Sequence, residues 1–276
     1  MTNVKRSDLH HNFLKSIIVR LDFQGVLESE MDKVLIHIKP YAKEHGFLRY
    51  EEKNANQIDI AFTDKGIQNS FEATNKVRSQ KVFSFINEDR GFVLDVSNNF
   101  ICLMVNTTRY TPFEDYCLII PSIAEIYNNN IDFFTVKRFG LRKINECLIL
   151  EKERIKEFFA PAFFSYFDCL DGVNIIQSNH ANFFIIDKYH INLHSNIAQG
   201  TFDGKILYSI RLDIDSYLDN TEQINLLLSD SEEMKKVNDL IFKIYISSIT
   251  ERFIELLTDE SDFDNTIMIG VEPNER

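Results

Sequence analysis

The sequence predicts an α+β protein in which curved antiparallel sheets pack on long helices. Strand-like runs rich in Val, Ile and Phe follow one another with only turn residues between them, as in antiparallel meanders. Longer segments carry apolar residues at helical spacing behind capping residues. The 276 residues are 44% hydrophobic and 26% charged, as in ordinary globular proteins that bury a sizeable core. We divide the chain into an N-terminal α+β half, residues 1–150, and a C-terminal α+β half, residues 151–276, which ends in a long helix.

The first half begins with a strand and a helix. Residues 16–27 are mostly β-branched or apolar and end near Gly25, which predicts a strand. Apolar residues then recur at helical spacing, so we expect a helix over 30–44 that bends near Pro40. Turn residues separate the runs that follow, which predicts an antiparallel meander. Its four strands are expected near 48–62, 81–87, 91–97 and 100–108.

The motif Thr111-Pro112-Phe113-Glu114 predicts the start of a second helix. Threonine can accept a hydrogen bond from a free N–H group, proline loses no bond at the first helical position, and Glu114 closes a capping box. Pro121 is expected to kink this helix, which should stop at the asparagines 128–130. The next run, 131–150, is long and strand-like.

The second half begins with a helical stretch from Glu151 that is interrupted at Pro161. From Ser229 onward, apolar residues repeat at helical spacing over about 25 residues, which predicts one long closing helix. The acidic segment after Asp259 is expected to be a solvated tail. Strands are expected between these helices, near 172–178, 181–187, 189–195 and 204–215.

A short sequence repeat links the two halves. Arg20-Leu-Asp-Phe23 and Arg211-Leu-Asp-Ile214 both lie in strand-like runs. If the repeat reflects a duplication, the chain consists of two similar halves of the β-α-β(4)-α type. If it does not, the same elements can share one extended sheet.

The cysteines indicate a reducing compartment. No CxxC pair occurs, and the N-terminus lacks the hydrophobic stretch of a secretory signal. We therefore expect buried free thiols in a cytoplasmic protein. No apolar run approaches the roughly 18 residues needed to span a bilayer, so a membrane role is not expected. The four cysteines, each in an apolar run, are Cys102, Cys117, Cys147 and Cys169.

Positive charge is concentrated in one predicted strand of an acidic chain, whose net charge is 30 − 42 = −12. Strand alternation places Arg138 and Arg142 on one face. Gly140 lies between them and has no side chain, so another group can approach the strand closely there. Two guanidinium groups so placed can bind a carboxylate or phosphate, or they can hold the sheet together by pairing with Asp132 or Glu146. The candidate ligand- or partner-binding residues are Lys137, Arg138, Gly140, Arg142, Lys143 and Asn145.

The central quarter of the chain, residues 82–147, resembles a known family. It contains a meander ending in Phe100-Ile-Cys-Leu, a helix start Tyr110-x-x-Phe-Glu114 and the strand Arg138-Phe-Gly-Leu-Arg-Lys-Ile-Asn145. These features resemble an uncharacterised, sporadically distributed bacterial family with the strand motif Arg-x-Gly-Leu-Arg-Tyr-x-Asn, and Lys143 stands where that family usually has tyrosine. The resemblance implies a cytoplasmic accessory protein, and patchy occurrence is typical of anti-phage defence or toxin–antitoxin loci.

Two other polar groups can carry chemistry. His190 and His194 share a strand face, but they lie about 13 Å apart along an extended strand, too far to bind one ion without a bend. Asp213 and Asp215 also share a face and can hold Mg²⁺ or act as acid and base, although a solvated outer face explains them equally. Because phosphate-loop, hydrolase and zinc-protease signatures are missing from the sequence, we predict no catalytic residue, metal ligand or cofactor.

These observations favour a non-enzymatic binding or regulatory protein that acts through protein–protein contacts, and the resemblance implies a role in bacterial anti-phage defence or a toxin–antitoxin system. The acidic charge suits a basic partner protein and disfavours binding to a nucleic-acid backbone. One alternative is a nucleotide- or metal-dependent enzyme or sensor in which Arg138 and Arg142 hold a phosphate. A nucleic-acid-binding module that uses the same strand is the other alternative.

Overall fold

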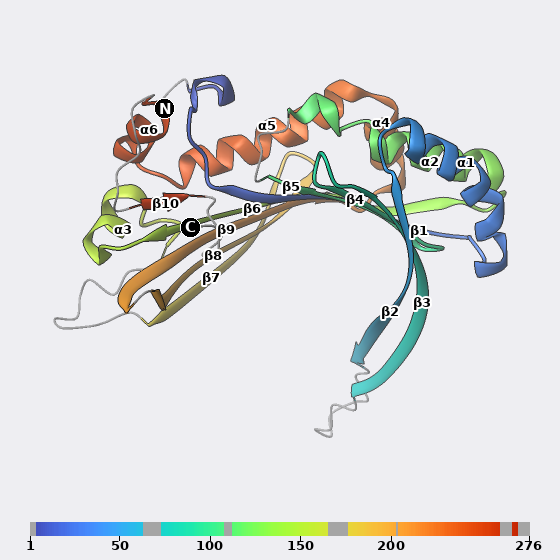
Figure 1. The fold of residues 1–276 in the computed structure, drawn as a ribbon, viewed down its shortest axis with the longest axis horizontal. Coiled ribbons are helices and arrows are strands. Elements are labelled where there is room, and N and C mark those ends of the chain that lie inside the picture. The colour runs from blue at the N-terminus through green and yellow to red at the C-terminus, as the bar shows by residue number, and fades with distance from the viewer. Residues whose placement is uncertain are drawn as a thin grey trace.

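The protein contains one large antiparallel sheet with helices packed on one of its faces (Figure 1). This confirms the predicted α+β class, and strands from both sequence halves lie in the same sheet. The computed structural model describes residues 4–62, 73–107, 112–164, 176–202, 204–259 and 267–269.

The sheet has the strand order β2-β3-β4-β5-β1-β6-β9-β8-β7, and β10 pairs with β6 beside this path. All described strand pairs are antiparallel. The first strand of the chain therefore lies near the middle of the sheet, next to the sixth. The strands are β1 (Leu14–Gln24), β2 (Arg49–Phe62), β3 (Ala73–Asn87), β4 (Phe92–Val96), β5 (Phe100–Asn106), β6 (Thr135–Ile149), β7 (Gln177–Ile186), β8 (Tyr189–Phe202), β9 (Lys205–Leu218) and β10 (Ile267–Ile269).

The helices lie over the convex side of the arched sheet, while the β2–β3 hairpin extends away from them (Figure 1). Helix α2 contacts β5, α4 contacts β6, and α5 contacts both β6 and β9. Among the described residues, no helix is long and apolar enough to cross a membrane. The helices are α1 (Met31–Glu44), α2 (Ile119–Asn130), α3 (Lys152–Phe158), α4 (Thr221–Ser229), α5 (Ser231–Ser247) and α6 (Glu251–Thr258), and single 3-10 turns are η1 (Arg6–Asp8), η2 (Glu28–Glu30) and η3 (Phe113–Asp115).

Strand β1 shows how the sequence pattern assigns the two faces of the sheet. Its side chains alternate strictly between buried and half-buried positions from Ser16 to Phe23. Ile17, Val19 and Leu21 are at most 1% exposed and pack under the helices. Burial of one such side chain contributes about 1.5–3 kcal/mol. Their neighbours point to the other face, which the described helices do not cover.

Phenylalanine fills the end of the core under α5 and α6. The ring of Phe13 stacks on Phe253 with centroids 5.6 Å apart and meets Phe159 edge-on at 6.0 Å. Phe158 stacks on the same Phe253 ring at 4.8 Å. Such ring pairs add to the stability gained from buried area alone, which explains the use of many Phe residues in the core.

The second helix begins later than the motif at Thr111 predicts. The chain makes a single 3-10 turn at η3, and α2 begins only at Ile119. Pro121 therefore lies in the first turn of α2, where its missing N–H has no helical partner to lose. The predicted kink at this proline is wrong for that reason.

The long closing helix predicted from Ser229 is divided into α5 and α6, and α4 before it was not predicted. Asp230 caps α5 by accepting a hydrogen bond from the N–H of Glu232, and Thr250 caps α6 in the same way. Between α5 and α6 the backbone pairs with the end of α3, because Thr250 N donates to Phe158 O at 2.9 Å. Apolar periodicity continues across the break between α5 and α6, so periodicity alone did not reveal it.

The remaining strands correct two sequence predictions. One strand, β7, lies where two were expected near 172–178 and 181–187, and residues 165–175 lie outside the described residues. Within the predicted acidic tail, β10 pairs with residues 147–149 of β6.

Three of the four cysteines are buried free thiols, as predicted, and Cys169 lies outside the described residues. Burial raises the pKa of Cys102 to about 11 and also raises the pKa of Cys117 and Cys147 above their usual value. We therefore expect these three thiols to resist a thiol reagent such as DTNB at pH 8 and to react fully after denaturation. Peptide mapping by mass spectrometry checks each site separately, and rapid native labelling of Cys147 would contradict its burial.

Candidate functional site

The motif strand β6 lies between β1 and β9, the two strands that carry the short sequence repeat. Arg138 is opposite Asp22 of β1, and Arg142 is opposite Asp215 of β9. All these side chains point to the side of the sheet that the described helices leave uncovered. We call this side the concave face and define its centre by Arg20, Asp22, Arg138, Arg142, Arg211, Asp213, Asp215 and Tyr217.

Arg138 is bound within the concave face. Its Nη2 donates to Asp215 Oδ2 at 2.7 Å, its Nη1 lies 3.8 Å from Asp22 Oδ2, and its guanidinium lies 4.7 Å from the Tyr217 ring centre. A methyl group added at Gly140 would lie 2.9 Å from Arg138 Nη1. The guanidinium of Arg138 thus fills the space that a side chain at position 140 would occupy.

Arg142 forms a two-pronged ion pair with Asp213. Nε and Nη2 of Arg142 donate to the two carboxylate oxygens at 2.7 and 2.5 Å, and Arg211 lies 3.6 Å from the same carboxylate. The Asp213 side chain is 9% exposed, whereas that of Arg142 is 42% exposed. Hydrogen bonding to Asp213 raises the pKa of the Arg142 guanidinium. Such bidentate pairs fix geometry as well as charge.

The neighbouring carboxylate and the β1 arginine extend this network. Burial raises the pKa of the Asp215 carboxyl, although Arg138 and Arg142 oppose that shift. Arg20 Nε donates to Asp22 Oδ1 at 2.8 Å, and its guanidinium lies 4.4 Å from the ring centre of Phe100. The centre of the concave face holds four arginines and three aspartates, so its net charge is 4 − 3 = +1.

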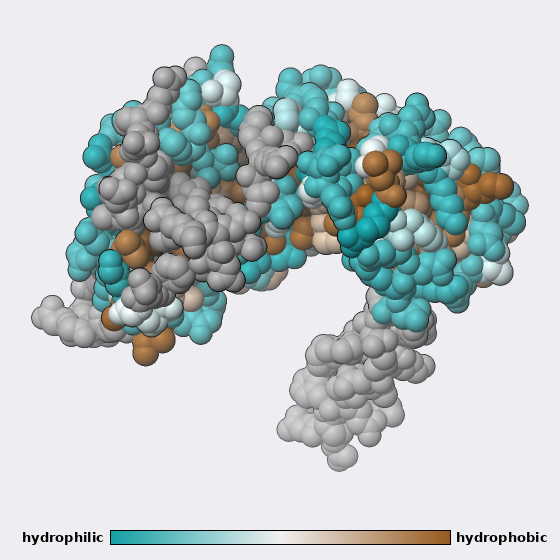
Figure 2. Space-filling view, in the orientation of Figure 1, coloured by the Kyte–Doolittle hydropathy of each residue, from teal (hydrophilic) through white to brown (hydrophobic). Residues whose placement is uncertain are grey.

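Aromatic and apolar side chains border the charged centre. His190 stacks on Tyr217 with ring centres 5.0 Å apart and lies 3.6 Å from Asp219. On β7, Phe183 is 70% exposed and Ile185 is 62% exposed, and both share the concave face with their β8 neighbours. Figure 2 shows that the molecule is hollowed beneath the arch of the sheet.

The alternative metal sites do not form in the described part of the chain. No group of three or more His, Cys, Asp or Glu side chains is placed there to hold an ion. His190 contacts Asp219, and His194 meets the Phe183 ring edge-on at 5.8 Å. Asp213 and Asp215 share a face as expected, but both bind arginines.

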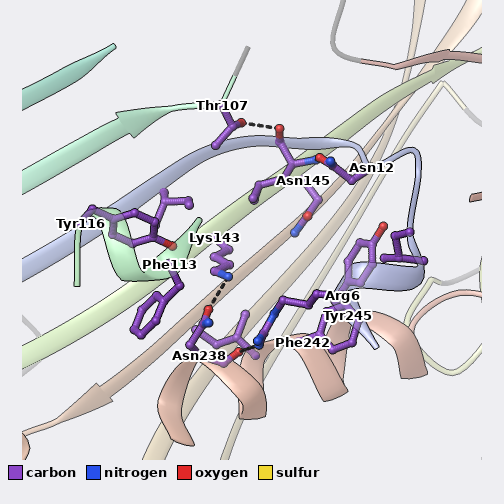
Figure 3. Close-up of a pocket in the computed structure, with 14 residues that line it drawn as sticks. Arg6, Asn12, Thr107, Phe113, Tyr116, Lys143, Asn145, Asn238, Phe242 and Tyr245 are labelled. Atoms are coloured by element: carbon purple, nitrogen blue, oxygen red, sulfur yellow. Dashed lines mark hydrogen bonds between the residues drawn. The ribbon is translucent and has the colours of Figure 1, made fainter. Parts of the chain in front are cut away.

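The six sequence-predicted site residues lie on two faces. Arg138, Gly140 and Arg142 belong to the concave face, whereas Lys143 and Asn145 point under the helices (Figure 3). Lys137 is exposed. The strand period of two explains this division from Arg138 to Asn145, since odd and even positions of that stretch point to opposite sides.

Sequence reasoning missed four residues of the concave face. The partners of the two motif arginines come from β1 and β9, not from Asp132 or Glu146. The signal was present in the repeat, because both Arg-Leu-Asp copies place their arginine and aspartate beside β6. The missed residues are Arg20, Asp22, Arg211 and Tyr217.

Comparison with known proteins gives little further information. No protein-family model matches the chain, and no curated protein matches it. Two solved structures of the S. pombe Pct1 RNA triphosphatase, one in complex with the Spt5 CTD, have a TM-score of 0.16 to this chain. They are 6% and 7% identical to it, with alignments covering 85% and 86% of this chain and 85% and 84% of the Pct1 chains. A TM-score this low does not show a shared fold.

Proposed function

We propose that this chain is a non-enzymatic binding protein whose concave face contacts a partner protein. The observation that carries this proposal is the pairing within that face: each of its four arginines already contacts a carboxylate. A surface with both charge signs, a near-zero sum and apolar side chains at its border suits a protein partner with complementary charges.

The same pairing argues against a phosphate-rich ligand. Such a ligand would have to take the arginines from Asp22, Asp213 and Asp215 while those carboxylates repel it. Tight nucleic-acid binding relies on several unpaired cations that replace counterions, and the central net charge of +1 gives little of this effect. The enzyme or sensor alternative and the nucleic-acid alternative are therefore less well supported.

We place this binding role in a bacterial anti-phage defence or toxin–antitoxin system, a setting that rests on the family resemblance of residues 82–147. A basic partner fits the overall charge of −12, which speeds encounter with a positively charged protein. A cytoplasmic location fits the buried free thiols.

We also propose that β1 and β9 are equivalent strands of two similar halves. Their Arg-Leu-Asp copies lie on either side of β6 and point to the same face. A duplication of this kind would supply both borders of the charged centre.

Exposed apolar residues on β7 allow a direct test of partner binding. The variant Phe183→Ser with Ile185→Ser removes two exposed side chains of the concave face and leaves the core untouched. Purification from the native host is expected to recover a stoichiometric partner with the wild type and about tenfold less with this variant, because a few aromatic and apolar side chains carry much of the energy of an interface. Quantitative mass spectrometry of the purified complex measures the ratio.

The matched control changes the same residue types away from β7, because Ile36 lies on α1 and Phe133 in the connection between α2 and β6. Phe133→Ser with Ile36→Ser alters side chains that are 79% and 67% exposed, and it should leave partner recovery unchanged. Equal loss in both variants would contradict a role for the concave face. A monomer that carries a bound nucleotide or divalent metal would support the enzyme or sensor alternative instead.

A further inference from the structure

A cavity lies on the opposite side of β6, between the sheet and helix α5 (Figure 3). Its volume is about 100 Å³, and most of its wall is apolar. For comparison, an engineered apolar cavity of about 150 Å³ holds a benzene molecule. The space therefore suits a molecule of a few heavy atoms. The apolar wall consists of Leu9, Leu14, Ile17, Phe113, Ile241 and Phe242.

Lys143 brings an amine into this cavity. Its Nζ donates to Asn238 Oδ1 at 2.5 Å, which is the hydrogen bond drawn in Figure 3. An ammonium group has three donors, and the described residues supply this single acceptor. Desolvation, with a smaller contribution from Arg6, lowers the pKa of Lys143 to about 7.

Arg6 brings a second cation to the same place. Its Nη2 donates to the backbone oxygen of Asn238 at 2.5 Å, and its Nη1 pairs with Asp239 at 2.7 Å. The buried Nε of Arg6 has no hydrogen-bond partner. Below about pH 7, where Lys143 is protonated, two cations, Arg6 and Lys143, thus meet one carboxylate, Asp239, which leaves one positive charge uncompensated beside the cavity.

Tyr245 lines the cavity, and its hydroxyl lies buried behind the ring. This oxygen is buried and has no hydrogen-bond partner. Burial raises the pKa of Tyr245 well above its usual value, so the group keeps its proton at neutral pH. Buried polar groups are normally paired, and the ammonium of Lys143 and the Nε of Arg6 both have donors without acceptors beside this space.

We propose that this cavity binds a small monocarboxylate with a short apolar tail, whose carboxylate lies beside Lys143 and Arg6 and whose tail lies against the α5 side chains. One negative charge restores the local charge balance, and two carboxylate oxygens can accept from several of the unmatched donors. Inorganic phosphate satisfies the cations but not the apolar wall. A neutral amide fills the space but leaves the cations without a counter-charge. This site is separate from the concave face and does not depend on the proposed partner.

Isothermal titration calorimetry with butyrate tests the proposal on the full-length protein. At pH 6 butyrate should bind at least about tenfold more tightly than butyramide or inorganic phosphate, because a charge-assisted hydrogen bond contributes about 1.5–3 kcal/mol. Lys143→Met should lose about tenfold or more of this affinity. The matched control is Lys137→Met, which replaces an exposed lysine of the same strand and should bind butyrate like the wild type.

A pH series separates the role of Lys143 from other contacts. The titratable groups that face it are Arg6 of η1, Asp239 and Tyr245 of α5, and Tyr116, which follows η3. Since the pKa of Lys143 is about 7, affinity for butyrate should fall about tenfold from pH 6 to pH 8 as the amine loses its proton. Lys143→Met should abolish this pH dependence.

Four results would overturn the proposal. These are the absence of butyrate binding, equal binding of butyramide, tighter binding of phosphate, and butyrate binding that Lys143→Met leaves unchanged. The first would mean that the cavity holds only solvent. None of them bears on recovery of a partner protein, so this proposal and the proposed function fail independently.

Discussion

Replacing Lys143 by methionine is expected to stabilise the folded protein by about 3 kcal/mol at pH 6 and to give no gain at pH 10. Burial lowers the pKa of this lysine from 10.5 to about 7. One pKa unit corresponds to about 1.4 kcal/mol, so keeping the buried amine charged below pH 6 costs about 5 kcal/mol. Methionine removes this cost but also removes the hydrogen bond to Asn238, which is why the net gain is smaller.

The pH range of this effect follows from the direction of the shift. Between pH 7 and 10.5 the unfolded chain holds a proton that the folded protein has released, so wild-type stability rises with pH over that interval. The advantage of Lys143→Met should therefore shrink as the pH rises and vanish near pH 10. Urea unfolding at several pH values measures it.

The exposed Lys137 is the control for this stability prediction. Lys137→Met should change the free energy of unfolding by less than about 0.5 kcal/mol at every pH, as exposed substitutions usually do. A stability difference between wild type and Lys143→Met that is the same at pH 6 and pH 10 would show that Lys143 titrates normally. Such a result would also remove one support of the carboxylate site.

Breaking the Arg142–Asp213 pair is expected to cost about 2–3 kcal/mol when only the arginine is removed. Arg142→Leu leaves a carboxylate that is 9% exposed, with only Arg211 at 3.6 Å to compensate it. Asp213→Leu should cost less, because the Arg142 side chain is 42% exposed and water can solvate it. Chemical denaturation of each variant gives these free energies.

The double variant completes the cycle. Arg142→Leu with Asp213→Leu is expected to cost about 2 kcal/mol less than the sum of the single changes, because neither partner is then left unpaired. The control is Arg252→Leu, which breaks an exposed pair with Glu255 and should cost under about 1 kcal/mol. Additive single effects at Arg142 and Asp213 would contradict a coupled pair.

Local sequence patterns predicted most of the fold. The alternation in β1, the meander from β2 to β5 and the long strand β6 all follow from hydrophobic periodicity and turn residues. The break between α5 and α6 did not, since it depends on pairing between Thr250 and α3. Periodicity indicates which side of an element is apolar, whereas the break between α5 and α6 depends on contacts with a distant segment.

The candidate site could also be predicted only in part, because sequence patterns show which face of a strand carries a side chain but not which strands become neighbours. Alternation correctly places Arg138 and Arg142 on one face, and the sequence singles out this strand. Which carboxylates they meet depends on the order β1-β6-β9, in which strands far apart in sequence become neighbours. The cavity beside Lys143 is likewise assembled from η1, β6 and α5, and no short motif encodes such a combination.

The central position of β1 has a consequence for how the chain reaches its native state. Ile18 pairs with Arg142, and 142 − 18 = 124 residues separate the two. A ribosome therefore releases β1 and its other neighbour, β5, before β6 exists, so only the β6 side of β1 must stay unpaired meanwhile. Contacts of such long sequence separation slow folding. The two parts of the sheet, β2-β3-β4-β5-β1 and β9-β8-β7, are thus joined only once β6 is in place.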